Sequence, residues 1–365
     1  MLILHKSHIE PVGNGLTRLV YPVTETSDAG KVTHQLWGEV REEYGKFLCT
    51  ERCDAVLLGV LHYALKHGHD IEAELPVSRE LYFNLTNLLI PLLCGSRIKK
   101  PVLKMTYSAE LLPNAGAVGT GVSLGVDSLY TICRHGKQSA TPYPVTHLLY
   151  FNIGSHGRGN AAECTHLVHQ QKVTEFAREY DYELVTLNSN YADVFHQHYC
   201  DMHAFAAAFA VFSLQKLWSS YLYASAGYPE ITLKFPVEKN IPAAVLMPVL
   251  NGVFATETTR FRADAEGVER FEKIRFLSRC EMAQKYLFVC VKGGSNCCRC
   301  LKCVRTILRL RLLGAIKDFS RVFPEEKCNL FHEIYLLIRK TWRRNLFVDD
   351  IVTAFFKKLF RRNAK

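Results

Sequence analysis

The sequence lacks the long apolar segments that membrane proteins need. No run of eighteen or more apolar residues occurs in its 365 residues, so a membrane span is not expected. The first residues, MLILHKSHIEPVGNG, contain an early His and Lys and no cleavable apolar core, which argues against a secretory signal. We therefore expect a cytoplasmic protein.

Cysteine is not present in a number that suits a disulfide framework. The chain has 13 cysteines, an odd number. In a chain without an export signal, scattered thiols are expected to be reduced and mostly buried. Four of them, however, fall within residues 297–303, with Cys290 just upstream. This cluster needs an explanation of its own.

Strong net charge is absent from most of the chain. The formal net charge is +10, but residues 337–365 contain nine Lys or Arg against two Asp, which leaves about +3 for the rest. A nearly neutral body argues against a whole surface shaped for nucleic acid. The composition is otherwise that of a globular protein, and 365 residues are enough for two domains or for one large domain with appendages.

The first part of the chain, residues 1–112, predicts an N-terminal α+β domain. The segments TRLVYPVTE and HQLWGEV are typical of strands, with the turn-rich TSDAGK between them, and VLKMTY predicts a further short strand. Asp54 can cap a helix that stops at Gly68, and Ser78 can cap another that stops at Gly95. No motif here carries chemistry, so we expect a scaffold or a substrate-shaping domain.

Strands and helices alternate from about residue 113. The strand-like segments are AVGTGVS, THLLYFNIG, YELVTLNS and YLYASAGYP. Between them lie helical segments, including one near 161–180 and the Ala-rich HAFAAAFAVFSLQKLWSS. The alternation predicts an α/β fold over residues 113–285, with a doubly wound, mostly parallel sheet covered on both faces. Ligands bind at the carboxyl ends of such strands.

The segment GVSLGVDSL, residues 121–129, joins the first of these strands to a helix. Free backbone N–H groups and the helix dipole favour a phosphate at such a turn. Gly125 lets the backbone approach phosphate oxygens, and Ser123 and Ser128 can donate hydrogen bonds. Asp127 can cap the helix or help to hold Mg²⁺. A Walker P-loop is excluded because no Gly-Lys-Ser/Thr follows; a capped turn that binds nothing remains an alternative.

The clustered cysteines predict a metal site. The spacing C-x6-C-x2-C-x2-C is formed by Cys290, Cys297, Cys300 and Cys303. Tetrahedral Zn²⁺ needs four thiolates at ~2.3 Å, and each C-x2-C turn supplies two. Cys298 is the spare, since adjacent cysteines rarely both point inward. We predict a structural zinc site that staples residues 286–320, the four-cysteine segment, with chance clustering or redox use as alternatives.

Two further groups have competing interpretations. HQHYCDMH brings together four metal-ligating side chains, which are His196, His198, Cys200 and His203, but it is also typical of a polar loop before a helix. In GVFATETTRF, Glu257 and Arg260 could reach the ligand site or form a surface ion pair.

The 121–129 loop resembles the PP-loop of the ATP-pyrophosphatase (N-type, adenine-nucleotide α-hydrolase-like) superfamily, whose signature is Ser-Gly-Gly-x-Asp-Ser. Leu124 stands at the position of the first glycine. A PP-loop with a late C-x6-8-C-x2-C-x2-C cluster is similar to the 7-cyano-7-deazaguanine synthase branch. SAGYPE, residues 225–230, and ERFEKIRFL, with Lys273, resemble further segments of that branch. The resemblance covers about residues 115–315.

The resemblance implies a HUP/PP-loop type sheet and an ATP-dependent ligase. Such an enzyme adenylates a carboxylate, releases pyrophosphate and lets ammonia or an amine displace AMP. It implies ATP and Mg²⁺ as cofactors beside Zn²⁺, and a carboxylate-bearing small molecule or protein as substrate. The resemblance assigns binding of the pyrophosphate to Ser123, Gly125, Asp127 and Ser128. It assigns contact with the adenine to the backbone around Tyr150, Phe151 and Asn152. It assigns catalysis to Asp127 and Lys273, the lysine by offsetting phosphate charge.

The departure at Leu124 sets an expectation for the backbone. With a negative φ its side chain could point away from the phosphates, whereas a positive φ would indicate that ATP turnover has been lost. Two other functions therefore stay open. One is a catalytically degenerate zinc protein that binds nucleotides or nucleic acid. The other is a PP-loop tRNA-modifying enzyme, such as a thiolase, although metal-bound thiolates are poor sulfur carriers.

Residues 321–365 predict a basic helical tail. Its apolar side is formed by Leu346, Ile351, Phe355 and Phe356, with basic residues opposite. Such a helix could bind an anionic membrane surface, nucleic acid or an acidic partner, or it could dock with its basic face in solvent. Nucleic acid at this tail and a homodimer stay open.

Overall fold

The structure is a computed structural model that describes residues 1–28, 30–95, 99–196, 198–226, 251–290, 293–342 and 351. Its strands are β1 (Leu2–Leu4), β2 (His8–Gly13), β3 (Leu16–Ser27), β4 (Gly30–Arg41), β5 (Ile71–Ala73), β6 (Val77–Ser78), β7 (Leu103–Lys104), β8 (Tyr107–Ser108), β9 (Ala117–Gly121), β10 (His147–Asn152), β11 (Glu183–Ser189), β12 (Trp218–Ala224) and β13 (Arg260–Asp264).

Helices connect these strands and form the C-terminal part. The α-helices are α1 (Asp54–His67), α2 (Arg79–Asn84), α3 (Ile90–Cys94), α4 (Val126–Arg134), α5 (Asn160–Glu179), α6 (Tyr191–Phe195), α7 (Tyr199–Ser213), α10 (Arg270–Leu277), α11 (Glu281–Tyr286), α12 (Leu301–Leu313) and α13 (Leu330–Trp342). Short 3-10 helices are η1 (Glu42–Phe47), η3 (Ile316–Phe319) and η4 (Glu325–Lys327), and η2 (Leu85–Leu89) is a π-helix.

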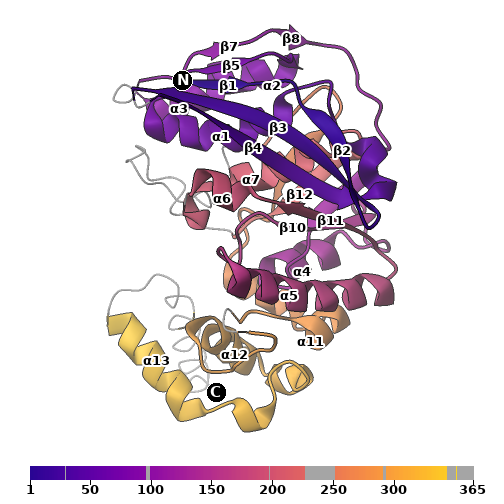
Figure 1. Cartoon of the computed structure of the whole chain (residues 1–365). Coiled ribbons are helices and arrows are strands. Elements are labelled where there is room, and N and C mark those ends of the chain that lie inside the picture. Colours follow the sequence, from indigo (N-terminus) through magenta and orange to yellow (C-terminus); the bar gives the residue numbers. More distant parts are fainter. Residues whose placement is uncertain are drawn as a thin grey trace.

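One large sheet runs through the molecule (Figure 1). It has 11 strands in the order β13-β12-β9-β10-β11-β4-β3-β1-β5-β7, with β2 paired to β3. The five strands from β9 to β13 are all parallel, and β9, the first of them in the chain, lies between β10 and β12. The connections therefore leave β9 toward both sides, which creates a switch point at its carboxyl end. The predicted α/β class with a mostly parallel sheet is confirmed.

The sheet continues across the predicted boundary at residue 112. β11 pairs antiparallel with β4, and Leu187 lies opposite Val40 in this register. The two long strands of the hairpin, β3 and β4, then extend the sheet toward β1. Residues 1–112 and 113–285 thus share one sheet, and the boundary between them falls in the connection from β8 to β9.

Helices cover both faces of the parallel strands, because successive strand side chains point to opposite faces. On β10, Leu149 packs in a cluster with α1 and α7, whereas Leu148 and Tyr150 pack in a second cluster with α4, α5 and α12. Helix α7 is apolar all round and almost wholly buried, as expected of a helix between a sheet and a second helix. That second helix is α1, whose Gly59 allows a close approach to Phe209 of α7.

The predicted C-terminal ends of the two helices of the N-terminal part, at Gly68 and Gly95, are confirmed. Helix α1 stops at Gly68, whose φ of 67° favours glycine. Ser78 stands at the N-cap position of α2, but its side chain makes no capping hydrogen bond. The π-helix η2 then joins α2 to α3, and Gly95 is the C-cap of α3. Asp54 does not cap α1: its carboxylate accepts hydrogen bonds from the Ser78 N–H at 2.8 Å and the Ser78 hydroxyl at 2.5 Å. Burial raises its pKa to about 6.

The structure differs from the sequence prediction in three segments. The Ala-rich helix ends at Ser213, and residues 218–220 belong to β12, where Trp218 and Tyr221 pack as strand residues. VLKMTY forms two two-residue strands, β7 and β8, in different sheets. Strand β2 was not predicted, because most of its residues are exposed and it has no apolar alternation.

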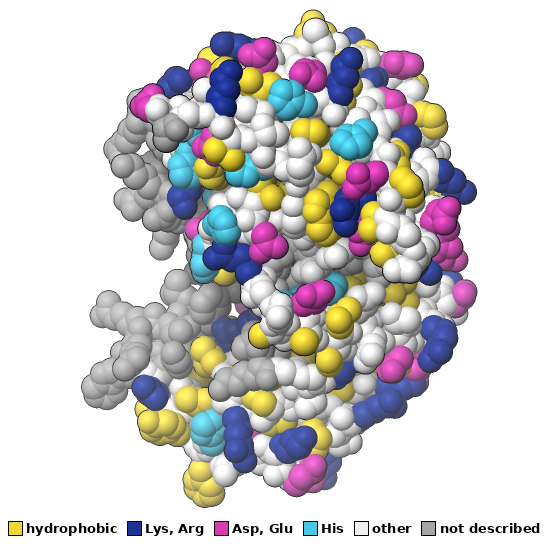
Figure 2. Space-filling model, in the orientation of Figure 1, with side chains coloured by type: hydrophobic (Ala, Val, Ile, Leu, Met, Phe, Trp, Pro, Cys, Tyr) yellow, Lys and Arg dark blue, Asp and Glu magenta, His cyan; other side chains and the backbone are white. Residues whose placement is uncertain are grey.

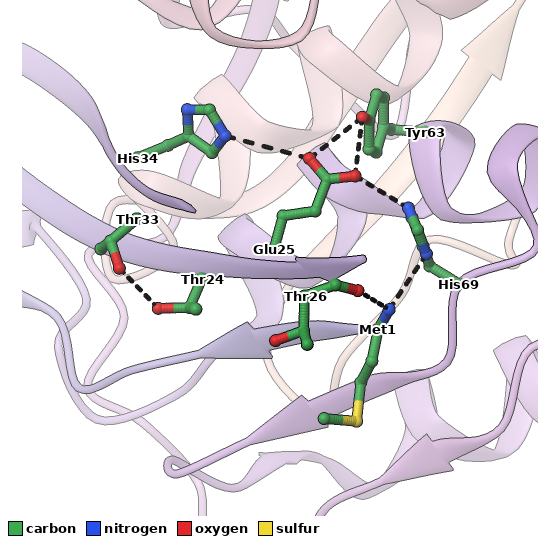
Figure 3. Close-up of polar contacts among 8 residues, drawn as sticks. All are labelled: Met1, Thr24, Glu25, Thr26, Thr33, His34, Tyr63 and His69. Atoms are coloured by element: carbon green, nitrogen blue, oxygen red, sulfur yellow. Dashed lines mark hydrogen bonds and ion pairs between the residues drawn. The ribbon is translucent and has the colours of Figure 1, made fainter. Parts of the chain in front are cut away.

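A polar cluster ties β1 and β3 to α1 (Figure 3). The Glu25 carboxylate of β3 accepts a hydrogen bond from the Tyr63 hydroxyl of α1 at 3.0 Å and contacts His69 Nε2 at 2.9 Å. The other ring nitrogen of His69 lies 3.0 Å from the amino group of Met1, which donates to the Thr26 carbonyl at 2.9 Å. These contacts join β1 and β3 to the loop that follows α1.

The C-terminal helices lie beyond α4 and α5, at the far end of the molecule from the β3–β4 hairpin (Figure 1). Arg311 of α12 holds α13 through two hydrogen bonds to the fully buried Glu333 carboxylate, at 2.8 and 3.3 Å. Ile351 packs against Val304 and Leu308 of α12. The other residues predicted for the apolar side of the tail, which are Leu346, Phe355 and Phe356, lie outside the described residues.

Figure 2 shows Lys and Arg side chains among exposed apolar ones at this end of the molecule. The exposed apolar side chains of α13 are Leu330, Phe331, Ile334, Tyr335 and Ile338. Among the described helices, none is long and apolar enough to span a membrane.

Candidate phosphate-binding loop and metal centre

The 121–129 loop lies at the carboxyl end of β9, where the strand order reverses. Its neighbour β10 continues for three residues, 150–152, beyond the last pair with β9, which joins Leu149 and Gly121. Helix α4 then begins at Val126 with Gly125 as its N-cap. The loop therefore presents the N-terminus of α4 at the position where parallel sheets bind ligands.

The hydroxyl groups of Ser123 and Ser128 form hydrogen bonds within this loop. The Ser123 and Ser128 hydroxyl oxygens lie 3.1 Å apart, and Ser128 donates to the Gly125 carbonyl at 3.2 Å. The Gly125 N–H points to the Ser123 hydroxyl at 3.4 Å. Gly125 has an ordinary φ of −76°, so glycine is not needed for the backbone angle. A Cβ there would lie only 3.3 Å from the Ser123 hydroxyl oxygen.

Leu124 adopts a φ of 54°, in the left-handed region that favours glycine. A positive φ at this position is what we expected if ATP turnover had been lost. Its side chain is fully buried, however, in the cluster that includes Val126, Cys303 and Ile307, so it does not fill the solvent side of the loop. The loop thus keeps the backbone form that a glycine would give, at the cost of conformational strain at the leucine.

Asp127 and Lys273, both predicted for catalysis, are in contact. The Lys273 ammonium lies 3.0 Å from Asp127 Oδ1, and Arg270 contacts Oδ2 at 2.8 Å. Lys273 also donates to the Ser225 carbonyl at the end of β12, at 2.5 Å. Burial lowers the pKa of the fully buried Lys273, and the Asp127 carboxylate opposes this shift. Strands β9, β12 and helix α10 thus converge on one charged cluster.

Glu266, which sequence reasoning missed, lies at the same edge. It follows β13 directly, after Ala265, whose φ of 60° is also in the left-handed region. Its Oε1 atom is buried and has no hydrogen-bond partner among the described residues. Burial raises its pKa to about 7, although the nearby Lys273 lowers it. Its position directly after a parallel strand was the signal that could have identified it.

The residues predicted to meet adenine point in different directions. Tyr150 is buried under α5, and its hydroxyl donates to the His166 carbonyl at 3.1 Å. Phe151 packs on the opposite face of the sheet. Asn152 lies at the strand end, where its amide donates to the Asn188 side chain of β11 at 3.0 Å. Only Asn152 has a side chain at the carboxyl edge, and the role of the 150–152 backbone stays a prediction.

Three histidines gather around the Tyr150 hydroxyl, and they too were missed. His156 Nε2 and His169 Nδ1 each lie 3.3 Å from it, and His166 stacks on the Tyr150 ring. Burial lowers the pKa of His166 and His169 to about 4, so both are neutral at pH 7. His169 also packs against Phe288, which precedes the cysteine cluster. These rings pack α5 against β10, and His169 also interacts with the Ser123 backbone of the loop.

The HQHYCDMH residues do not converge on a metal position. His203 contacts the Tyr223 hydroxyl at 2.5 Å, and His196 contacts Arg158, while Cys200 is exposed. Within the described ranges, the four clustered cysteines form the only group of three or more His, Cys, Asp or Glu ligand atoms close enough to hold a metal ion.

Glu257 and Arg260 do not reach the carboxyl edge of the sheet. Glu257 accepts a hydrogen bond from the Glu80 N–H at 3.0 Å, and Arg260 pairs with the Glu80 carboxylate. Arg260 is the first residue of β13, so it lies at the opposite end of that strand from Glu266. The pair therefore joins β13 to α2.

Of the segment SAGYPE, residues 225–230, only Ser225 and Ala226 fall within the described residues.

The four predicted metal ligands converge. The Sγ atoms of Cys290, Cys297, Cys300 and Cys303 all lie within 4.8 Å of one another. Cys300 and Cys303 are 3.5 Å apart, and Cys297 and Cys303 are 4.0 Å apart. Four thiolates at ~2.3 Å from a tetrahedral ion would lie about 3.8 Å from each other. The cluster could therefore bind a metal such as zinc.

Backbone N–H groups near Cys297 favour the thiolate form that binds a metal ion. The Cys300 N–H points to Cys297 Sγ at 3.3 Å. Burial would raise the pKa of Cys297, but the N–H groups of Arg299 and Cys300 outweigh it and lower the pKa to about 6. Cys298 turns away with a φ of 57° and contacts the Asn296 carbonyl. It is not among the four converging thiols, as the sequence predicted.

No protein-family model, curated protein or solved structure matches the chain. The resemblance to PP-loop proteins therefore rests on the loop and cysteine motifs.

Proposed function

We propose that the chain binds the phosphates of ATP at the 121–129 loop and uses the nucleotide to adenylate a carboxylate. The observation that carries the proposal is the position of this loop at the switch point, with the N-terminus of α4 and the Asp127–Lys273 pair beside it. Phosphates are favoured there by the N–H groups of the first turn of α4 and by the helix dipole. The HUP/PP-loop type of sheet belongs to the same proposal.

The charged cluster fits the demands of this chemistry. A carboxylate oxygen attacks the α-phosphorus, the bond to the β-phosphate breaks, and pyrophosphate leaves with both electrons. Lys273 and Arg270, now paired with Asp127, are the cations that can stabilise this leaving group. Ammonia or an amine then attacks the acyl carbon, AMP leaves, and the nitrogen releases a proton. With bound phosphates, Asp127 would hold Mg²⁺, which neutralises phosphate charge.

We assign zinc to the four cysteines as a structural ion. Four thiolates close the coordination shell, so no position remains for water or substrate. The same closure argues against a thiolase, because thiolates that bind a metal are poor sulfur carriers.

A nucleotide-binding protein without turnover is the second candidate. The ion pairs of Asp127 favour it, since a carboxylate held by two cations is less free to bind Mg²⁺. The strained φ of Leu124 is the second feature in its favour.

Product analysis separates these functions. The full-length protein is incubated with Mg²⁺, ATP, ammonium and a panel of carboxylic acids that includes deazapurine carboxylates, and the nucleotides are resolved by chromatography. Adenylation gives AMP and pyrophosphate, and Asp127→Ala stops their release while zinc content stays the same. ADP and phosphate would contradict the proposal. Calorimetric binding of Mg·ATP without products from any acid would favour the second candidate.

A further inference from the structure

The 121–129 loop is in direct contact with the four-cysteine segment. The Phe288 N–H donates to the Leu124 carbonyl at 2.8 Å, and Phe288 lies two residues before Cys290. The Phe288 carbonyl oxygen also lies 3.9 Å from the position of a Cβ on Gly125. A backbone hydrogen bond thus fixes the residue of the loop that has a left-handed backbone.

Asn296 organises the part of the four-cysteine segment that makes this contact. Its side chain is 5% exposed. Its carbonyl oxygen accepts from the Val289 N–H at 2.9 Å, and its amide donates to the Leu287 carbonyl at 2.8 Å. A second donation, at 3.0 Å, reaches the Val322 carbonyl. One amide therefore holds both neighbours of Phe288, and the next residue in the chain is the metal ligand Cys297.

Packing gives a second connection between the loop and the cysteines. The buried Leu124 side chain belongs to the same apolar cluster as Cys290, Cys303 and Ile307. Cys303 and Ile307 lie on α12, which begins directly after Cys300. An ion that draws the four thiolates together therefore also fixes a helix of the apolar cluster that contains Leu124.

We propose that Asn296 is a positioning residue and that metal bound by the four cysteines holds the 121–129 loop in its phosphate-binding form. This inference rests on the proposed function, because it makes the affinity for nucleotide phosphates depend on metal occupancy. Without the ion, the four clustered thiols lose the interaction that holds them together, and Cys290 no longer fixes the end of the segment that contains Phe288. Leu124 then relaxes from its strained backbone angle, since the Phe288 hydrogen bond no longer fixes it.

Coupling of this kind is reciprocal. If metal raises the affinity for phosphates by some factor, bound phosphates raise the affinity for metal by the same factor. We expect a factor of about tenfold or more, within the usual range for coupled sites.

Two measurements on the full chain test the inference. The first is calorimetric titration of Mg²⁺-pyrophosphate into zinc-loaded, zinc-stripped and zinc-reloaded protein, and we expect weaker binding after stripping that reloading restores. The second is hydrogen exchange of the 121–129 amides in the same three samples, with the β3–β4 hairpin as internal reference. We expect faster exchange in the loop after stripping and unchanged exchange in the hairpin.

The two readouts separate failure of the inference from failure of the proposed function. If zinc-loaded protein binds neither pyrophosphate nor ATP, the proposed function fails, and hydrogen exchange alone decides the inference. Loop exchange that is the same in loaded and stripped protein overturns the inference, whatever the nucleotide result. Equal pyrophosphate affinity in the two samples overturns it as well.

Variants of Asn296 test its own role. Asn296→Ala removes three hydrogen bonds and Asn296→Asp removes the two donations, so loop exchange should rise while zinc content remains one per chain. Asn329→Ala is the matched control, since the Asn329 side-chain oxygen accepts from the His332 N–H in the same region without touching the loop. Unchanged loop exchange in an Asn296 variant that still holds zinc would show that this residue does not position the loop.

Discussion

The buried ammonium of Lys273 lies 3.0 Å from Asp127 Oδ1, while Arg270 contacts the other carboxylate oxygen at 2.8 Å. The three charges are not equivalent, because the Lys273 side chain is fully buried and the Asp127 side chain is 23% exposed. Removal of the carboxylate takes away the acidic group in direct contact with a buried cation, whereas removal of Lys273 leaves a partly solvated carboxylate with Arg270.

We therefore predict unequal losses of stability from the two sides of this pair. Asp127→Ala should lower the free energy of unfolding by about 2–4 kcal/mol, since an unpaired buried charge is costly. Lys273→Met should cost about 1 kcal/mol, because Asp127 keeps a partner and water. Urea denaturation at pH 7 measures both. Arg270→Met is the control, with a smaller loss, and equal losses for Asp127→Ala and Lys273→Met would contradict the burial of Lys273.

Glu266 should make stability depend on pH. Burial raises its pKa from 4.5 to about 7 in the folded protein. The folded state therefore holds this proton more tightly than the unfolded state does. Its contribution to the free energy of unfolding is complete below pH 4.5 and is lost as the pH rises to about 7.

Glu266→Gln should remove this part of the pH dependence, because glutamine has no charged form to be penalised by burial. Urea denaturation at several pH values between about 5 and about 8 compares the slopes. The exposed Glu269, three residues further along, provides the control Glu269→Gln, which should follow the unchanged protein. Parallel curves for the unchanged protein and Glu266→Gln would mean that Glu266 is ionised throughout this range.

Local sequence signals predicted the elements around the loop and the ligand set of the metal centre. The strand–loop–helix pattern located β9 and α4, glycine marked the end of α1, and the cysteine spacing identified the converging thiols. Each signal depends on neighbouring residues in the chain. The importance of Asp127 and Lys273 was expected only from the resemblance, and their contact was not predicted.

Non-local relationships could not be predicted in this way. The pairing of Leu187 with Val40, which unites the two halves, depends on an antiparallel register between distant strands. The side chain of Tyr150 faces α5 because it lies one residue from Leu149, and the sequence does not say which face meets which helix. The role of Asn296 likewise depends on three carbonyl and amide groups that the fold brings to it.

Substitution of neighbouring cysteines should affect zinc binding differently. Cys300→Ser should abolish tight binding of zinc, because Cys300 Sγ lies among the four converging thiols, 3.5 Å from Cys303. Cys298→Ser should keep one zinc ion per chain, since Cys298 points to the Asn296 carbonyl instead. Elemental analysis of the purified variants measures the metal, and thermal denaturation with and without a chelator measures its effect on stability. Equal zinc loss in both variants would refute this ligand set.

Gly59 joins the two halves of the chain through the contact of α1 with α7. A Cβ at this position would lie 3.1 Å from Phe209 Cδ2 and 3.3 Å from Tyr191 Cε2, and Tyr191 donates a hydrogen bond to the Gly59 carbonyl at 2.6 Å. A larger side chain must push the helices apart. We therefore expect Gly59→Val to lower the free energy of unfolding by about 1–3 kcal/mol, the usual cost of overpacking.

The number of thermal unfolding transitions also tests whether the two halves of the chain unfold together. Because β4 and β11 belong to one sheet, we expect Gly59→Val to shift a single cooperative transition, followed by calorimetry, for the whole protein. Lys66→Val places the same side chain on the exposed side of α1 and should leave the midpoint nearly unchanged. Two separate transitions, with only one shifted by Gly59→Val, would mean that residues 1–112 unfold as an independent domain in spite of the shared sheet.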